Sequence, residues 1–329
     1  MRTVFLRRCL VALFAAAVSF GAISQAQAES LRIGYQKYGT LVLLKAKGTL
    51  EKRLAAQGVD VQWTEFPGGP QLLEGLNVGS VDFGTVGEAP PIFAQAAGAN
   101  LVYVGNEPPS PSSEAIVVPK DSVLRSVADL KGKKIALNKG SNVHYLLVKA
   151  LEKAGVAYKD VQTVYLPPAD ARAAFERGSV DAWVIWDPFL AAAEKQIGAR
   201  VLADGKGVVA NYQFYLAARP YAEKQQEIVR IVLEEIARVD DWGARHPQEV
   251  ATILAAQTGL STDVVALAAS RYAYGVKPIS ADVIAQQQKV ADAFAQLKLI
   301  PRPIAVKDAQ LAQGPSASVH QPANAQAAR

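Results

Sequence analysis

The chain has 329 residues, of which 50% are hydrophobic and 20% are charged, the composition of a globular protein. The length suits two domains with packed cores, and the composition excludes disordered, collagen-like and coiled-coil chains. With 35 basic and 30 acidic side chains the chain is mildly basic, but its lysines are spread out, so no nucleic-acid partner is expected.

The first 28 residues have the pattern of an export signal. Three arginines precede an apolar run over 9–23, and the small-x-small sequence Ala26-Gln27-Ala28 follows it. Fifteen residues are too few to span a membrane, which takes about 20, so we expect cleavage after Ala28 rather than a membrane anchor. Cleavage removes the single cysteine, Cys9, and leaves 32 basic against 30 acidic side chains. We therefore expect an exported protein that is nearly neutral and has no thiol.

Short β-rich runs alternate with helical patterns through the first part of the body. They predict strands and helices in turn at 31–35, 41–54, 60–66, 71–78, 81–86, 90–97 and 101–104. Such an alternation predicts a largely parallel sheet that is covered by helices on both faces.

The same series recurs further along the chain. It predicts strands and helices in turn at 134–137, 143–154, 161–166, 170–177, 182–185 and 188–196. Gly79-Ser80-Val81-Asp82 recurs as Gly178-Ser179-Val180-Asp181, an offset of 99 residues, and at that offset Glu88 falls on Asp187. Two similar α/β lobes are therefore predicted.

Beyond Pro220 the pattern becomes helical. Helices are expected to stop at His246-Pro247 and at Gly259, and Ser261 and Ser280 are suitable N-caps for two more. This region has no strands of its own, so we expect it to pack onto one of the lobes. The segment 312–329 is rich in Ala, Gln, Pro and Ser without periodicity, which predicts a disordered tail.

In open parallel sheets ligands bind beyond the carboxyl ends of the strands, so the turns after strands are candidate sites. Polar or aromatic side chains occupy four of these turns, at 36–40, 87–91, 138–144 and 186–189. In the third, Gly140 lets the backbone approach a ligand, and Ser141 and Asn142 offer hydrogen bonds at the start of an amphipathic helix. The free N–H groups of such a helix start suit an oxyanion, although the same residues would equally serve as a simple cap.

The acidic and aromatic residues of these turns allow two interpretations. Glu88 and Asp187 would repel an anion, so helix capping is the favoured role, with an ammonium group as the alternative partner. Tyr38, Trp186 and Phe189 could either contact an alkyl or aryl group or belong to the core.

Patterns typical of catalysis are scarce. His144 and His246, the histidines outside the expected tail, do not have the spacing of zinc ligands. The sequence contains neither Gly-x-x-x-x-Gly-Lys nor Gly-x-Gly-x-x-Gly, so no nucleotide-binding loop is indicated. We expect no catalytic residue, no metal and no cofactor.

Several motifs nevertheless resemble one family, the periplasmic aliphatic sulfonate-binding proteins of ABC importers. These motifs are Gly34-Tyr35-Gln36-Lys37, the stretch 74–84 around Gly79-Ser80-Val81-Asp82, Val86-Gly87-Glu88-Ala89-Pro90-Pro91, the stretch 137–144 around Lys139-Gly140-Ser141-Asn142, and Trp183-Val184-Ile185-Trp186-Asp187-Pro188-Phe189. The resemblance covers about 31–308. The wider group of two-lobed substrate-binding proteins also includes taurine, nitrate and thiamine-precursor binders.

The resemblance implies an α/β fold, the two-lobed periplasmic-binding-protein fold of type II, in which each lobe is a mostly parallel sheet flanked by helices. The chain would cross between the lobes twice, near 115–118 and 214–217. Lobe one would comprise 31–115 plus 220–308, and lobe two 116–219.

The resemblance also implies a function without catalysis. A monomer would bind an alkanesulfonate between its lobes and deliver it, for sulfur acquisition, to an inner-membrane permease driven by a cytoplasmic ATPase. Backbone N–H groups and polar side chains would hold the sulfonate, and the alkyl tail would lie against Trp186. The residues expected to bind the ligand are Gln36, Tyr38, Gly87, Glu88, Ala89, Ser141, Asn142, Val143, Trp186 and Asp187.

Two alternatives stay open. The ligand could be taurine, nitrate or a thiamine precursor, and taurine would need an acid such as Glu88 or Asp187 for its ammonium group. More remotely, the chain could be an enzyme on the same fold, although the related pyrimidine synthases use cysteines that the chain would lack after export.

Overall fold

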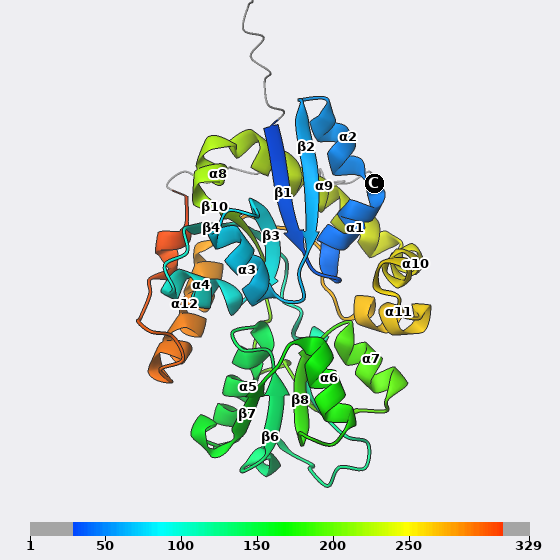
Figure 1. Ribbon diagram of the computed structural model, residues 1–329, viewed down its shortest axis with the longest axis vertical. Helices are drawn as coiled ribbons and strands as arrows, with labels where there is room; N and C mark the ends of the chain where they lie inside the picture. Colours follow the sequence, from blue (N-terminus) through cyan, green and yellow to red (C-terminus); the bar gives the residue numbers. More distant parts are fainter. Residues whose placement is uncertain (1–28, 312–329) are drawn as a thin grey trace, which may run out of the picture.

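The computed structural model describes residues 29–311. The expected export signal at 1–28 and the expected tail at 312–329 lie outside these described residues. Figure 1 shows two lobes, one above the other, each built around its own sheet with helices packed against it. The predicted α/β architecture of two lobes is therefore observed.

The first sheet has five strands in the order β2-β1-β3-β10-β4. Their bounds are β1 (Glu29–Tyr35), β2 (Val59–Glu65), β3 (Phe83–Gly87), β4 (Leu101–Asn106) and β10 (Gln213–Ala218). β1 is parallel to β2 and β3, whereas β10 is antiparallel to both of its neighbours. β3 and β4 are buried along their whole length, as expected for strands with helices on both faces.

The second sheet repeats this arrangement in the order β7-β6-β8-β5-β9. Its strands are β5 (Glu114–Val118), β6 (Lys134–Leu137), β7 (Gln162–Tyr165), β8 (Ala182–Trp186) and β9 (Arg200–Asp204). Here β5 is the antiparallel strand and occupies the position that β10 has in the first sheet. The internal repeat predicted from the sequence thus appears as two sheets of one topology.

The repeated Gly-Ser-Val-Asp sequence has the same structural role in both lobes. The carboxylate of Asp82 accepts a hydrogen bond from the backbone N–H of Arg32 at 2.8 Å, and that of Asp181 accepts one from Lys134 at 2.7 Å. Each aspartate also donates its own N–H to the carbonyl of the same partner at 2.8 Å. The motif therefore joins the start of the strand that follows it, β3 or β8, to that strand's parallel neighbour, β1 or β6, and it is a folding motif rather than a binding motif.

Seven helices connect the strands within the two sheets. They are α1 (Gly39–Lys47), α2 (Thr49–Ala55), α3 (Gly69–Asn77), α4 (Pro90–Ala96), α5 (Asn142–Lys153), α6 (Pro168–Glu176) and α7 (Phe189–Gln196). The single helix expected over 41–54 is two helices, because Gly48 adopts a left-handed conformation with φ of 61° between them. Short 3-10 turns lie at Pro111–Ser113, Val127–Leu130, Tyr158–Asp160 and Val306–Ala309.

The helical region after β10 packs mainly onto the first lobe. It comprises α8 (Arg219–Lys224), α9 (Gln226–Arg245), α10 (Pro247–Thr258), α11 (Thr262–Ser270) and α12 (Ala281–Gln296). α9 contributes its apolar face to the core that also contains α1 and α2, whereas α11 reaches α7 of the second lobe. Among the described residues no single helix is long and apolar enough to cross a membrane; α10 and α11 meet that measure only as a pair bent by 120°.

The chain passes between the sheets at 107–113 and at 205–212. These segments are bonded to each other, since the N–H of Ser110 donates to the carbonyl of Asn211 at 3.2 Å. The expected crossings at 115–118 and 214–217 lie instead inside β5 and β10. Residues 213–218, which were expected in lobe two, therefore belong to the sheet of the first lobe. The sequence did not distinguish the two, because an apolar run is as typical of a buried strand as of a hinge.

Candidate functional site

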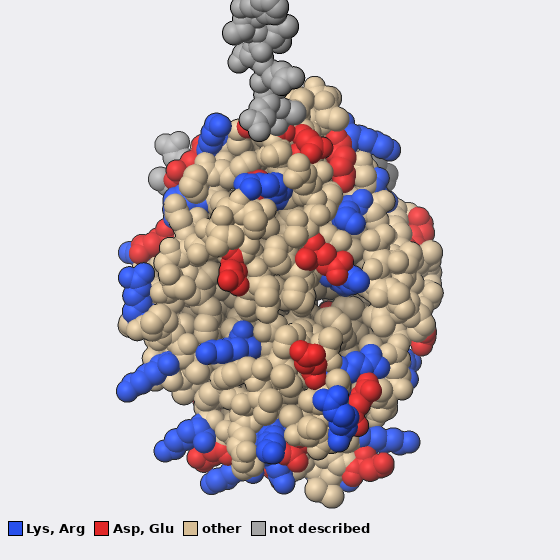
Figure 2. Space-filling model, in the orientation of Figure 1, with Lys and Arg blue, Asp and Glu red and all other residues tan. Residues whose placement is uncertain are grey.

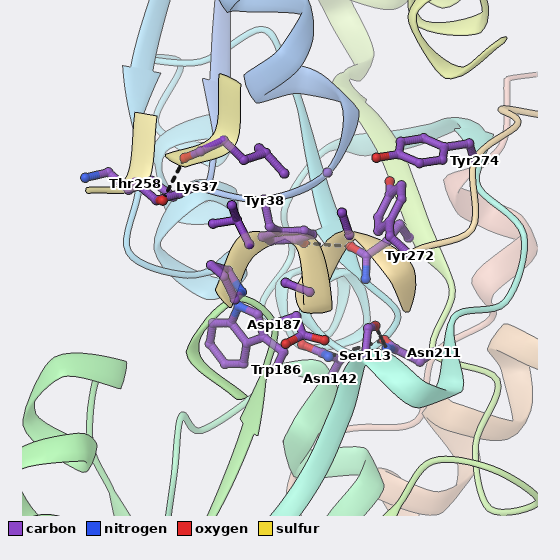
Figure 3. A pocket seen from close by; sticks show the side chains of 17 residues that line it. Lys37, Tyr38, Ser113, Asn142, Trp186, Asp187, Asn211, Thr258, Tyr272 and Tyr274 are labelled. Atoms are coloured by element: carbon purple, nitrogen blue, oxygen red, sulfur yellow. Dashed lines mark hydrogen bonds between the residues drawn. The ribbon is translucent and has the colours of Figure 1, made fainter. Parts of the chain in front are cut away.

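An interlobe pocket of about 580 Å³, counted out to its mouth, lies where the two lobes meet. The first lobe supplies the turn after β1, part of β10, and residues of α10, α11 and the segment that follows them. The second lobe supplies the start of α5 and the end of β8. A ligand in this pocket would touch both lobes at once (Figure 3).

Hydrogen-bond donors gather where two helices begin at the pocket. Gly39 is the first residue of α1 and Asn142 is the first residue of α5, and both line the pocket. The first N–H groups of a helix have no partner within it and carry the positive end of its dipole. The side-chain amide of Asn142 donates to Glu114 and, at 3.2 Å, to Asn211, so its orientation is fixed. This end of the pocket suits an anionic group.

The turn before α5 is held in place by His144. The backbone N–H of Gly140 donates to Nδ1 of His144 at 3.2 Å, which leaves Nε2 to carry the proton toward the hydroxyl of Tyr158 at 2.7 Å. Burial, with a smaller effect of Lys139, lowers the pKa of His144 to about 4, so the ring is neutral at neutral pH. His144 is thus a support for the turn and not a ligand.

The remainder of the pocket is apolar and aromatic. Trp186 comes from the second lobe, while Tyr272, Tyr274 and Val265 come from the first. The rings of Tyr272 and Tyr274 pack edge to face with centroids 4.9 Å apart. Figure 3 places Trp186 and the two tyrosines on different sides of the pocket. Such walls bury an alkyl or ring substituent favourably.

Tyr38 links the turn after β1 to β10 at the pocket wall. Its hydroxyl donates to the side-chain carbonyl of Gln213 at 2.6 Å. Burial raises the pKa of Tyr38, so the hydroxyl keeps its proton. Behind it, the amide of Gln36 donates to the carbonyl of Thr85 at 3.1 Å and does not line the pocket. The same amide lies 3.4 Å from the hydroxyl of Tyr38, so Gln36 supports Tyr38 from outside the pocket.

Gly87 marks a close approach of the two lobes. It ends β3 in the first lobe, and a Cβ atom there would lie 2.8 Å from Cβ of Asn142 in the second lobe. That separation is well below ordinary carbon contact of about 3.5–4.0 Å. Only glycine allows the lobes to meet as they do at this point.

Asp187 is the acidic residue of the interlobe pocket. Its Oδ1 accepts a hydrogen bond from the N–H of Ala191 in the first turn of α7 at 2.9 Å, although the N-cap position expected for Asp187 is held by Pro188. Its Oδ2 lies 3.5 Å from Nη1 of Arg271. Burial raises the pKa of Asp187 to about 6, although Arg271 and the N–H of Ala191 act in the opposite direction.

Glu88 lies elsewhere, although it is the counterpart of Asp187 in the repeat. Its side chain points to a separate hollow beside Tyr145 and Tyr212, and Oε2 accepts the N–H of Tyr212 at 3.3 Å. Burial raises the pKa of Glu88 to about 7. Glu88 lines this hollow and not the interlobe pocket, and it does not cap α4 as expected, because Ala89 holds the N-cap position and no side chain caps that helix.

The ten residues predicted to bind the ligand separate into two groups. Four line the interlobe pocket, namely Tyr38, Asn142, Trp186 and Asp187. The other six are buried around it without lining it, namely Gln36, Gly87, Glu88, Ala89, Ser141 and Val143. The hydroxyl of Ser141, for example, donates to the carbonyl of Asn138 at 2.7 Å and not to α5. Which residues contact a ligand stays a prediction.

Sequence reasoning missed the contribution of the late helical region. Leu254, Val265 and Tyr272 lie more than 200 positions from Tyr38 in the chain, yet they line the same pocket. The two tyrosines at 272 and 274, in a short stretch between helices, were the available signal. Asn211 and Gln213 were missed because they lie before the expected crossing at 214–217 and outside the four turns that follow predicted strands.

On the face shown in Figure 2, charge of neither sign gathers around the junction of the lobes. Acidic and basic side chains are interspersed over both lobes on the face shown in Figure 2, with a small opening at the level where the lobes meet. Within residues 29–311 no three His, Cys, Asp or Glu side chains are grouped to hold a metal ion. Any anion preference must arise from local donors.

Comparison with known proteins supports the resemblance. The sequence matches the family described as NMT1/THI5 like over residues 54–250. The solved structure of the alkanesulfonate-binding protein SsuA from Xanthomonas axonopodis pv. citri, bound to MOPS, is 45% identical with a TM-score of 0.83, covering 86% of this chain and 98% of that one. The periplasmic aliphatic sulphonate binding protein SsuA from Escherichia coli is 48% identical with a TM-score of 0.78, covering 86% and 97%.

A more distant relative belongs to the alternative ligand class. The taurine-binding periplasmic protein of Escherichia coli K12 is 29% identical over 251 residues, which are 72% of this chain and 76% of that protein. The fold predicted from the sequence is confirmed by the two solved structures. Since the family match spans more than half of the residues, the chain belongs to the NMT1/THI5-like family.

Proposed function

We propose that the protein is the periplasmic solute-binding component of an ABC importer and that it binds aliphatic sulfonates in the interlobe pocket. One observation carries this proposal: the pocket has hydrogen-bond donors at two helix starts and an apolar, aromatic remainder, and both lobes build it. An aliphatic sulfonate has the matching parts, an anionic head and an apolar tail.

The head would lie at the end of the pocket formed by Gly39 and Asn142, where first-turn N–H groups meet the three sulfonate oxygens. The tail would lie between Trp186 on one side and Val265 of α11 and Tyr272, which follows that helix, on the other. Each buried methylene is worth about 0.8 kcal/mol, so longer chains bind more tightly until the pocket is full. The solved relative that binds MOPS supports a sulfonate with a bulky substituent as a ligand of this fold.

Closure of the lobes would couple binding to transport. Each lobe supplies only part of the contacts, so a ligand binds the closed arrangement more tightly and shifts the population toward it. The two bonded segments at 107–113 and 205–212 would act as the hinge. An inner-membrane permease, driven by its ATPase, would recognise the closed form and receive the ligand.

We propose a binding role without catalysis, exercised by a monomer without a cofactor. The relatives reported above are named as binding proteins. The pocket lining contains no cysteine or histidine, and its one carboxylate, Asp187, is engaged by Ala191 and Arg271. The residues that line the pocket include no nucleophile paired with a general base, which covalent catalysis requires.

Calorimetry with a ligand panel tests the function. The panel contains linear alkanesulfonates of increasing length, taurine, nitrate, sulfate and an alkylphosphonate. We expect saturable binding of alkanesulfonates, with affinity rising with chain length, and weak binding of nitrate and sulfate, which have no tail. Absence of heat with every sulfonate would refute the proposal, and preference for nitrate or taurine would reassign the ligand within the family.

A further inference from the structure

Arg271 forms a bridge between the lobes at the edge of the interlobe pocket. It follows α11 of the first lobe, and its side chain reaches two carboxylates of the second lobe. Its Nη2 donates to Glu194 of α7 at 2.6 Å, and its Nη1 lies 3.5 Å from Oδ2 of Asp187. The side chains of Arg271 and Asp187 are only 18% and 7% exposed. The pair is therefore shielded from solvent and from screening by salt.

This bridge occupies the one carboxylate that the pocket presents to a ligand. Oδ1 of Asp187 already accepts the N–H of Ala191, and Oδ2 faces Arg271, so both oxygens have a partner. An anionic ligand then meets a neutralised carboxylate. A ligand that carries an ammonium group therefore meets a carboxylate whose charge Arg271 already compensates, and it must compete with the guanidinium for that charge.

We propose that Arg271 is a specificity-determining residue, which masks Asp187 and so favours sulfonates with a plain alkyl chain over zwitterionic aminosulfonates. This inference rests on the proposed function, because it concerns the choice among sulfonates. Two effects act in the same direction. The mask removes repulsion between Asp187 and the anionic head, and it withholds the counter-charge that an ammonium group needs once it leaves water.

Packing keeps Arg271 in place. Ala191 and Ala192 of α7 are buried against Val264 and Ala268 of α11 in a small apolar cluster. α11 ends one residue before Arg271. The same helix lines the pocket through Val265 and Ala268. The helix that touches the ligand therefore also sets the position of the masking side chain.

The test compares two ligands with the same two-carbon chain, ethanesulfonate and taurine, which differ only in the amino group. Calorimetric affinities for both are measured on the wild type and on Arg271→Gln. We expect the ratio of taurine to ethanesulfonate affinity to rise at least about tenfold in the variant, which corresponds to ~1.4 kcal/mol. Loss of the bridge between the lobes weakens the closed arrangement equally for both ligands. The ratio of the two affinities therefore reports the choice between ligands and not the ease of closure.

Two controls isolate the mask. Glu194→Gln breaks the shorter interlobe bond but leaves Arg271 free to face Asp187, so the ratio should not shift toward taurine. Arg271→Gln combined with Asp187→Asn should lose the gain for taurine, because the asparagine side chain still accepts the N–H of Ala191 but carries no charge.

A single variant, Asp187→Asn, keeps the inference testable if Arg271→Gln does not fold. With Asp187 masked in the wild type, this change should alter the affinity ratio by less than about twofold, whereas a free acid that bound the ammonium group would cost taurine about tenfold. The inference is overturned if Arg271→Gln leaves the ratio unchanged, or if Asp187→Asn weakens taurine selectively. A wild type that binds neither ligand would instead refute the proposed function.

Discussion

Replacing Gly87 with alanine should impair ligand binding by keeping the lobes apart. The added Cβ would lie 2.8 Å from Cβ and 3.0 Å from Cγ of Asn142, which belong to the opposite lobe. The backbone of Gly87 is ordinary extended strand, so alanine causes no conformational strain of its own. The conflict therefore arises only where the lobes meet.

The size of the effect follows from that overlap. A contact at 2.8 Å is at least about 0.7 Å shorter than ordinary carbon contact, and overpacking of this kind costs about 1–3 kcal/mol. The cost falls on the closed arrangement alone, so it reduces the population that binds ligand. Affinity for an alkanesulfonate should fall between about fivefold and 150-fold.

Calorimetry and small-angle X-ray scattering measure the two halves of this prediction. Gly87→Ala should bind more weakly and should show less compaction on adding ligand, while the melting temperature without ligand stays near that of the wild type. Gly84→Ala on the same strand is the matched control, because its Cβ would meet Leu72 at 2.7 Å within the first lobe. It should lower the melting temperature. Unchanged affinity and compaction in Gly87→Ala would refute the reasoning.

Three further changes test the site and the fold. Asn142→Ala removes the amide that donates to Glu114 and Asn211, which leaves buried acceptor oxygens beside the pocket without a partner, and it should weaken sulfonate binding about tenfold by calorimetry. Ser141→Ala, whose hydroxyl does not line the pocket, should leave affinity within about twofold. The pKa of Glu88 is raised to about 7, so the folded state holds a proton that the unfolded state releases above about pH 4.5. The free energy of unfolding should therefore fall as pH rises from 4.5 to 7, and urea titrations should show a shallower fall in Glu88→Gln. Ser280→Ala removes the side-chain hydrogen bond of 3.2 Å that caps α12, and it should lower the free energy of unfolding in urea by about 1 kcal/mol. Ser261→Ala should cost less, because the side chain of Ser261 makes no such bond to α11. Equal losses would show that the side chain of Ser280 does not stabilise α12 as a cap.

Local signals in the sequence were sufficient for most of the fold. The βαβ series has clear periodicity, and the repeat at an offset of 99 residues is enough to indicate two lobes. The break at Gly48 was missed because one glycine within an apolar pattern does not distinguish a bend from two helices. β9 was missed because all five of its residues are half-buried, which leaves no strong alternation.

The site was predictable only in part, for a physical reason. The turn after β1 and the start of α5 could be found because strand ends and helix starts have local patterns. The contribution of α11, Tyr272 and Arg271 depends on how a late helical segment folds back across the junction. No local pattern encodes that contact, since the partners are distant in the chain and the packing is tertiary.

The pairing of the crossing strands has a consequence for how the molecule is assembled. Asn106 pairs with Phe214 in the first sheet, and Ala115 pairs with Asp204 in the second. The second lobe is thus a continuous insertion, whose first strand β5 and last strand β9 are paired. In the first lobe, the strands on either side of the insertion, β4 and β10, are paired as well. During synthesis the inserted lobe can complete its sheet first, whereas the first sheet stays open along its middle until β10 emerges. The second lobe is therefore inserted within the first, so the chain forms two compact halves although only one of them is continuous in sequence.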